Sequence, residues 1–300
     1  MQYTVAFLGL GVMGYPMAGR LASRGFNTRV WNRTSAKSEA WQVEYGGENA
    51  GACANLVEAV AQADLVCTCL GNDEDVRSVV LEPDGALAHM RVGALLVDHT
   101  TTTALLAREI HTTANTRGIG FVDAPVSGGQ SGAEQGQLTI MLGGSPVDYD
   151  KAGPVLQSYA KRLTHIGEVG SGQLAKMVNQ ICIAGVLQGL SEGLVFAKAS
   201  GLDGEKLLAA IGEGAAQSWQ MNNRGATMLN DEFDFGFAVK WMIKDLNYCL
   251  QQADECNLNL PVTAMVLQQY HELAANNGGR LDTSSLIRSV AEIAQHKKRG

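Results

Sequence analysis

The residues whose types and spacing could do chemistry lie in three short glycine-rich blocks of a 300-residue chain that contains 35 glycines. The first block, Gly9-Leu10-Gly11-Val12-Met13-Gly14, is a G-x-G-x-x-G pattern with an apolar segment before it and a helical segment after it. In that order the first glycine makes a tight turn, the second lets the backbone approach a pyrophosphate, and the third lets helix pack on strand. The block predicts a dinucleotide site, the alternative being an ordinary strand-to-helix turn that binds nothing.

The segment Trp31-Asn32-Arg33-Thr34 ends the second predicted strand and bears on the choice of dinucleotide. Asn32 stands where sites for NAD typically carry an acidic residue that binds the ribose hydroxyls. Arg33 follows, and a guanidinium matches the geometry of a 2′-phosphate. The sequence therefore favours NADPH over NADH. The alternative is a solvated arginine at a strand end.

The second block, Asp123-Ala124-Pro125-Val126-Ser127-Gly128-Gly129, also follows a predicted strand. It therefore lies at the edge of a parallel sheet where ligands bind. Ser127 offers a hydroxyl, while Gly128 and Gly129 permit a close approach of backbone N–H groups, so the loop can hold a carboxylate. Taken alone, a loop of this composition is an ordinary turn in most proteins.

The third block runs from Gly170 to Asn179 and opens a long helical segment, with Ser171 as its candidate N-cap. Lys176 and Asn179 fall one turn apart on one helix face. The rest of this helix is apolar over much of its circumference, so Lys176 is either desolvated, lines a cleft, or solvates an exposed face. The segment by itself does not decide between these readings.

Strand-like and helix-like segments alternate up to about residue 165, which predicts an α/β domain with a parallel sheet covered on both faces. From 166 to 300 the pattern is helical, beginning with a helix over 172–200. Gly201 is its candidate C′ glycine, and Pro261 suits the first turn of a later helix. We therefore expect domains at 1–165 and 166–300, with the all-α domain hinged on the long helix.

Four spaced motifs give the chain a resemblance to the β-hydroxyacid dehydrogenases, the family of 3-hydroxyisobutyrate dehydrogenase and of tartronate and succinic semialdehyde reductases related to 6-phosphogluconate dehydrogenase. The motifs are GLGVMGYPMA, DAPVSGG with its continuation GAEQGQL, GSGQLAKMVNQ, and Lys244-Asp245-Leu246. The resemblance implies an NADP-binding Rossmann domain followed by a helical domain for substrate binding and dimerisation.

The same resemblance implies roles for individual residues. Lys176 would be the general acid and base that moves the proton when a hydride passes between NADP(H) and a small β-hydroxy acid or its semialdehyde or keto form. Ser127, Gly128, Gly129 and Asn179 would contact the carboxylate-bearing substrate. The cofactor would be held by the first glycine block, Asn32, Arg33, Thr34, Thr101 and Lys244. No metal site is expected. The chain departs from the family at Gln180, where many members have a second asparagine, and at Gln130-Ser131, which puts the substrate in doubt.

Two other functions stay open on this fold. One is an imine or ketone reductase, against which Lys176 counts, because such enzymes usually lack the lysine. The other is a non-catalytic NADP-binding module. A net charge of −7 disfavours nucleic acid as a partner, and the basic run Lys297-Lys298-Arg299 is interpreted as a solvated tail.

Composition also bears on location and assembly. No uninterrupted apolar run approaches the length of a membrane span, and no signal peptide is recognisable. Six scattered cysteines fit a reducing cytoplasm, with Cys67 and Cys69 packing as small apolar groups. Gly185, Gly189 and Gly193 form a smooth helical stripe, which predicts close packing against a helix of the same domain or of a second subunit in a homodimer or homotetramer.

Overall fold

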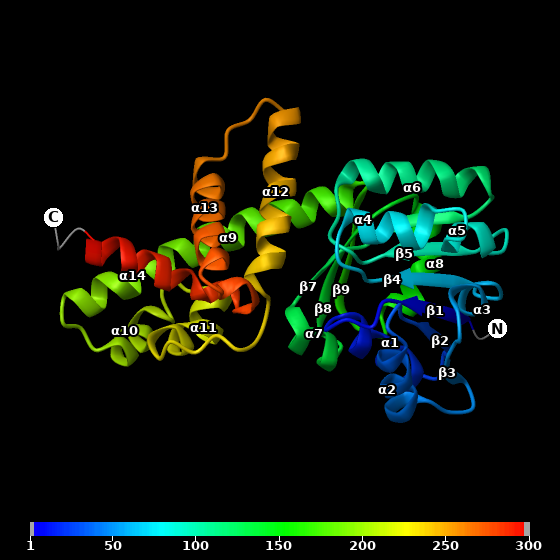
Figure 1. The fold of residues 1–300 in the computed structure, drawn as a ribbon, viewed down its shortest axis with the longest axis horizontal. Helices are drawn as coiled ribbons and strands as arrows, with labels where there is room; N and C mark the ends of the chain where they lie inside the picture. Colours follow the sequence, from blue (N-terminus) through cyan, green and yellow to red (C-terminus); the bar gives the residue numbers. More distant parts are fainter. Residues whose placement is uncertain (1–2, 297–300) are drawn as a thin grey trace. The chain divides into compact units, whose positions relative to one another are not determined.

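The computed structural model describes residues 3–296, and the chain divides after Lys176 into two compact units (Figure 1). The first unit contains the sheet, and the second is helical. The division falls inside helix α9 (Ser171–Ala199), so the residues of this helix up to Lys176 belong to the first unit. The basic run Lys297-Lys298-Arg299 lies outside the described residues.

The sheet of the first unit has the order β3-β2-β1-β4-β5-β6-β8-β7, with β9 paired to β8. The six strands from β3 to β6 are parallel, β8 runs antiparallel to β6 and β7, and β9 runs parallel to β8. Their bounds are β1 Thr4–Leu8, β2 Asn27–Trp31, β3 Ala50–Ala52, β4 Leu65–Thr68, β5 Leu95–Asp98, β6 Gly120–Asp123, β7 Val126–Ser127, β8 Leu138–Gly143 and β9 Ala160–Gly167. The predicted Rossmann architecture is confirmed.

Alternating side chains of the strands are buried in two separate hydrophobic cores, one on each face of the sheet. Val5 and Phe7 of β1 lie in one core, while Ala6 and Leu8 lie in the other. The first core is covered by α1 (Gly14–Ser23), α2 (Ser35–Tyr45), α7 (Gly129–Gln135) and α8 (Pro146–Leu156). The second is covered by α3 (Leu56–Val60), α4 (Asp73–Val76), a π-helical turn (Arg77–Leu81), α5 (Ala86–His89) and α6 (Ala104–Thr116). Both faces of the sheet are therefore buried, as an alternation of strands and helices requires.

Two further sequence predictions are borne out within this framework. Cys67 is buried in the first core and Cys69 packs against it, so both behave as small apolar side chains. Gly201 has φ +73° just beyond the end of α9, which is the left-handed conformation expected of a C′ glycine.

The second unit is built from helices around the C-terminal part of α9. Leu190 and Leu194 of α9 pack with Met221, Met228 and Phe233 in its core. The remaining helices are α10 Gly204–Ile211, α11 Trp219–Leu229, α12 Val239–Glu255, α13 Pro261–Ala275, two 3₁₀ turns at Gly278–Arg280 and Thr283–Ser285, and α14 Leu286–His296. Pro261 occupies the first turn of α13, as predicted.

The glycine stripe of α9 faces open space within the chain. A Cβ added at Gly185, Gly189 or Gly193 would meet no atom of the described residues within 4 Å. Val178 and Phe196 of the same helix are exposed as well. The expectation that the stripe packs against a helix of its own domain is therefore wrong, and the second subunit is the alternative that remains.

By length and composition alone, α9 is apolar enough to cross a membrane, with a mean hydropathy of 1.4 in its most apolar window. The prediction that no segment is long enough to span a membrane rests on uninterrupted apolar runs, whereas the mean hydropathy of α9 also includes its few polar residues. Of that window, 44% is buried inside the protein, and the core helix of a globular protein passes the same test. The hydropathy of α9 is accordingly weak evidence for a membrane helix.

Candidate active site

The glycine loop between β1 and α1 has the predicted strand–turn–helix arrangement. Gly9 has φ +97°, and a Cβ there would lie 2.4 Å from the carbonyl oxygen of Cys69. A Cβ on Gly14 would lie 2.0 Å from the carbonyl oxygen of Gly9, so helix and strand approach as closely as only glycine permits. A Cβ on Gly11 would meet no atom within 4 Å. The loop thus combines a turn that needs glycine, a tight packing contact and an open backbone face.

Asn32 fixes the glycine loop to the end of β2. Its Oδ1 accepts a hydrogen bond from the Leu10 N–H at 2.9 Å, and its Nδ2 donates to the Thr34 carbonyl oxygen at 3.0 Å. Arg33 extends into solvent with its side chain 78% exposed and forms an ion pair with Asp75 at 3.2 Å. Because exposed pairs contribute little to stability, another anion can replace Asp75 at small cost.

Three polar side chains lie side by side at the carboxyl ends of β4, β5 and β6, where the register pairs Thr68 with Asp98 and Asp98 with Asp123. Asp98 Oδ1 accepts from Thr68 Oγ1 at 2.7 Å and from the Thr100 N–H at 3.0 Å. Burial raises the pKa of Asp98 to about 6. Thr101 is half-buried in the loop that follows β5. This is the edge at which parallel α/β folds bind ligands.

A buried histidine holds the second residue of the predicted substrate block, Ala124. His99 Nδ1 lies 2.7 Å from the Ala124 carbonyl oxygen, and because a carbonyl can only accept, Nδ1 carries the proton. Nε2 therefore accepts from the Tyr159 hydroxyl at 2.8 Å. Burial lowers the pKa of His99 to about 4, so the ring is neutral, as these two bonds require.

The loop Ser127-Gly128-Gly129 joins β7 to α7. Ser127 is half-buried, and the two glycines have φ +130° and +62°, which residues with a side chain rarely adopt. A Cβ on Gly129 would meet no atom within 4 Å. The backbone at Gly129 is therefore open, two residues from the Ser127 hydroxyl.

The N-terminus of α9 is capped by a carboxylate that is distant in sequence. Asp123 Oδ1 accepts from the Gly170 N–H at 2.7 Å, and its Oδ2 accepts from the Gln173 N–H at 2.8 Å. The prediction that Ser171 is the N-cap is wrong, because Ser171 is the first residue of the helix and Asp123 takes the N–H that a cap would bind. Burial raises the pKa of Asp123 to about 6, against the lowering effect of these two bonds.

Lys176 lies in the second turn of α9 and is 8% exposed. Of the readings left open by the sequence, the solvated surface lysine is therefore excluded. Burial disfavours the charged form of an ammonium group, so such a lysine is costly unless its surroundings compensate it. Buried lysines occur at sites that transfer protons.

In the second unit, Asn179 begins a chain of polar side chains. Its Nδ2 donates to Gln180 Oε1 at 2.8 Å, and Gln180 Nε2 donates to Asp245 Oδ2 at 2.6 Å. Asp245, on α12, is 2% exposed, and its Oδ1 lies 3.1 Å from Lys244 Nζ, an ion pair without the alignment of a hydrogen bond. The Lys244 ammonium also lies 5.2 Å from the centre of the Tyr248 ring. Two predicted site residues, Asn179 and Lys244, are thus linked through Gln180 and Asp245.

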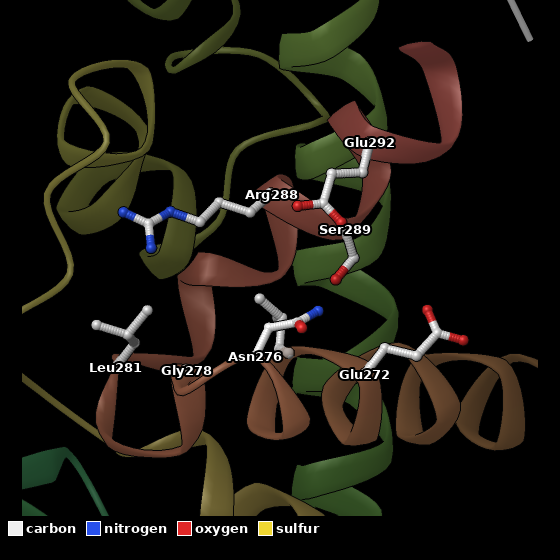
Figure 2. A pocket seen from close by; sticks show the side chains of 8 residues that line it. Glu272, Asn276, Gly278, Leu281, Arg288, Ser289 and Glu292 are labelled. Atoms are coloured by element: carbon white, nitrogen blue, oxygen red, sulfur yellow. The ribbon is translucent and has the colours of Figure 1, made fainter. Parts of the chain in front are cut away.

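A small cavity of about 100 Å³ in the second unit contains none of the predicted site residues (Figure 2). Its labelled lining includes Glu272, Glu292 and Arg288. Arg288 is engaged by Asp231, with bonds of 2.7 and 2.9 Å to the two carboxylate oxygens. The cavity therefore offers two carboxylates and a cation that is already paired, which is no basis for assigning a ligand.

Sequence reasoning did not assign a role to His99, Gln173 or Asp245. His99 and Gln173 contact groups that are 25 and more than 70 residues away along the chain, so no local pattern reveals them. The available signal was membership of a quoted motif, because Gln173 lies in GSGQLAKMVNQ and Asp245 lies in Lys244-Asp245-Leu246. Asp123 was noted only as the first residue of its block.

Taken together, the parallel sheet and the glycine loop at its first strand define a dinucleotide-binding domain of the Rossmann type. Residues 4–167 match the family described as the NAD-binding domain of 6-phosphogluconate dehydrogenase. Residues 170–290 match the family described as the NAD-binding domain of NADP-dependent 3-hydroxyisobutyrate dehydrogenase.

Individual relatives agree with these matches. An uncharacterized oxidoreductase of Shewanella frigidimarina is 53% identical over 94% of this chain and 96% of its own length. A probable mitochondrial 3-hydroxyisobutyrate dehydrogenase-like protein of Arabidopsis thaliana is 38% identical over 96% of this chain and 85% of its own length. The structure of Mycobacterium tuberculosis 3-hydroxyisobutyrate dehydrogenase with L-serine has a TM-score of 0.87 at 31% identity and covers 97% of this chain and 99% of that one. The chain belongs to the β-hydroxyacid dehydrogenase family and is an NAD(P)-dependent dehydrogenase.

Proposed function

We propose that the protein transfers a hydride between NADP(H) and a small β-hydroxy acid or its semialdehyde or keto form, with Lys176 as the general acid and base. The observation that carries this proposal is the burial of Lys176, 8% exposed, on a helix whose first turn is bonded to the strand end at Asp123. A buried amine on an anchored helix has the fixed position that proton transfer requires.

Each predicted residue then has a task. Lys176 donates a proton to the substrate oxygen during reduction and accepts it during oxidation. The Ser127 hydroxyl and the open backbone at Gly129 bind the substrate carboxylate. Asn179 turns its Nδ2 toward Gln180, which leaves Oδ1 to accept from the reacting hydroxyl. The bound nicotinamide supplies or takes up the hydride.

The glycine loop and the end of β2 fit a dinucleotide with a 2′-phosphate. The open face at Gly11 leaves room for a pyrophosphate, and no described side chain caps the first turn of α1. Asn32 puts no negative charge at the ribose, because its amide is neutral; its two ends are bonded to Leu10 and Thr34. The exposed guanidinium of Arg33 can exchange Asp75 for a phosphate. These contacts support a preference for NADPH over NADH, with Thr34, Thr101 and Lys244 as further cofactor contacts.

A panel of carbonyl compounds tests the substrate class. We would follow NADPH consumption with semialdehydes, glyoxylate, simple ketones and a cyclic imine, and NADP⁺ reduction with 3-hydroxyisobutyrate and L-serine. Turnover of the carboxylate-bearing compounds, and its loss with their methyl esters, is the expected result. Equal turnover of acid and ester, or a preference for ketone or imine, would contradict the proposal.

We further propose that the protein is a cytoplasmic homodimer or homotetramer. All six cysteines are free, which fits a reducing compartment. The open glycine stripe of α9 supports packing against a second subunit. Gly189→Leu should then lower the molecular mass in solution and the melting temperature. In a monomer the same change removes a helical glycine and should stabilise the helix by about 1 kcal/mol.

A further inference from the structure

We infer that Gln173 is a positioning residue: it fixes the loop Thr100–Thr102 to the first turns of α9 and so sets where Lys176 stands relative to Thr101. The inference rests on the proposed function, because the placement of Lys176 matters to turnover only if this amine moves the proton.

The amide of the Gln173 side chain forms hydrogen bonds with the two residues that flank Thr101. Its Oε1 accepts from the Thr102 N–H at 3.0 Å, and its Nε2 donates to the Thr100 carbonyl oxygen at 2.7 Å. Gln173 is 0% exposed, so neither bond competes with water. The amide has a single orientation, because exchanging its oxygen and nitrogen would set donor against donor and acceptor against acceptor. Thr101 lies between Thr100 and Thr102, the two residues that Gln173 binds.

The main chain of Gln173 is held just as firmly. Its N–H and that of Gly170 both donate to the Asp123 carboxylate. The contact is tight: a Cβ on Gly172 would lie 2.6 Å from the Asp123 carbonyl oxygen, and one on Gly143 would lie 2.6 Å from Asp123 Oδ1. Asp123 thus anchors the helix to the end of β6, and Gln173 anchors the loop after β5 to the helix.

The two hydrogen bonds of Gln173 fix the orientation of the Thr100–Thr102 loop on α9 as well as its contact with the helix. Apolar packing resists separation but has no directional preference, whereas two hydrogen bonds from one planar amide fix both distance and rotation. Lys176 follows Gln173 by three residues and so occupies a neighbouring row of the same helix surface. The amide therefore transmits the position of the Thr101 loop to the lysine through less than one turn of helix.

Two substitutions and a matched control test the inference. Gln173→Met keeps the length and burial of the side chain but loses both bonds. Gln173→Glu keeps the acceptor for Thr102 and sets an oxygen against the Thr100 carbonyl, and it carries the test if Gln173→Met does not fold. Gln188→Met is the control, because Gln188 is also a buried glutamine of α9 and bonds only to Glu192 among the described contacts. The readouts are amide hydrogen exchange at Thr102, NADPH binding by fluorescence, kcat, and the isotope effect with 4-deuterated NADPH.

In Gln173→Met we expect exchange at Thr102 to accelerate by about tenfold or more, while NADPH still binds. We expect kcat to fall about 10- to 100-fold, as for misplaced catalytic groups, and the isotope effect on kcat to rise because the chemical step becomes slower than product release. Gln188→Met should leave both kinetic quantities unchanged. Unchanged exchange at Thr102, or a kcat and isotope effect equal to those of Gln188→Met, overturns the inference. If Lys176→Ala itself remains fully active, the proposed function fails instead, whatever the exchange at Thr102 shows.

Discussion

Gln173 and Gln180 are both buried on α9 seven residues apart, one in each unit, and both are associated with a buried aspartate. Gln173 bonds only to main-chain groups, at Thr100 and Thr102, and its own N–H is held by Asp123. Gln180 bonds to the side chains of Asn179 and Asp245. The first arrangement determines a loop conformation, and the second determines the orientation of side chains.

The difference between main-chain and side-chain partners determines which residues can be replaced independently of one another. Main-chain groups are present whatever the sequence. A side chain that binds only main-chain groups therefore restricts substitution at its own position and not at the positions of its partners. A chain of side chains changes as a set, because each member needs a compatible neighbour. Gln180, which the resemblance marks as a departure from the family pattern, lies in the second arrangement. We therefore expect substrate differences within the family to involve the surroundings of Asn179 rather than those of Gln173.

Breaking the side-chain arrangement at Asp245 should have the largest effect on stability. Asp245→Leu leaves Gln180 Nε2 and the largely buried Lys244 ammonium without their carboxylate, which should lower the free energy of unfolding by about 3–5 kcal/mol. Urea denaturation measures this loss. The control is Asp254→Leu, an exposed aspartate of the same helix α12. Equal free energies of unfolding for the two variants would show that the Gln180–Asp245 hydrogen bond does not stabilise the protein.

Arg33 provides a contrast to both buried arrangements, because it is exposed and has one ion-pair partner. Arg33→Ala should weaken NADPH binding by about 1.5–3 kcal/mol, the worth of hydrogen bonds to a charged group. NADH binding should be almost unaffected. Titration calorimetry with both cofactors measures the difference. Asp75→Ala, which removes the competing carboxylate, should not weaken NADPH binding; an equal loss for the two cofactors in Arg33→Ala contradicts the assignment.

His99 belongs with Gln173, since it too holds a main-chain carbonyl, and its effect depends on pH. The unfolded chain takes up a proton at this histidine below its ordinary pKa of 6.5, whereas in the folded protein burial lowers the pKa to about 4. The stability that neutral His99 contributes is therefore present above pH 6.5 and is lost as pH falls toward 4. Between pH 7 and pH 5 the advantage of wild type over His99→Gln should shrink by about 1–2 kcal/mol. A constant advantage, or an NMR titration of His99 near pH 6.5, contradicts this account.

Two buried carboxylates act on stability in the opposite direction. Burial raises the pKa of Asp98 and of Asp123 to about 6, so the stability associated with their protonated forms is lost as pH rises toward 6. The pH dependence of wild type alone thus contains opposing contributions. The comparison with His99→Gln removes those shared terms.

Local sequence signals predicted the elements that a short pattern can specify. The glycine loop and its strand and helix, the alternating α/β unit and the end of α9 at Gly201 all follow from residues adjacent in the chain. The sequence singles out neither α8 nor α11 as a helix: α8 contains Pro154, and α11 carries Asn222, Asn223 and Gly225, all poor helix formers. Tertiary packing overrides these preferences.

The predicted site residues are present, but the groups that hold them were not foreseen. Asp123 binds the N–H of Gly170, 47 residues later at the start of α9, and Gln180 reaches Asp245 across 65 residues. Such pairs depend on strand order and helix packing, which a single sequence does not reveal. Ser171 was assigned as the cap because local patterns can only nominate a neighbour.

Replacement of Lys176 tests the central claim most directly. Because positioned proton transfer is worth about 10²- to 10⁴-fold, Lys176→Ala should lower kcat on the best substrate by at least about 100-fold while NADPH still binds. Lys176→Arg should not restore the rate, since a guanidinium does not release its proton at working pH. Lys198→Ala, an exposed lysine in the last turn of the same helix, should turn over as wild type does. A kcat of Lys176→Ala within about threefold of wild type would contradict the assignment of Lys176 as the group that moves the proton.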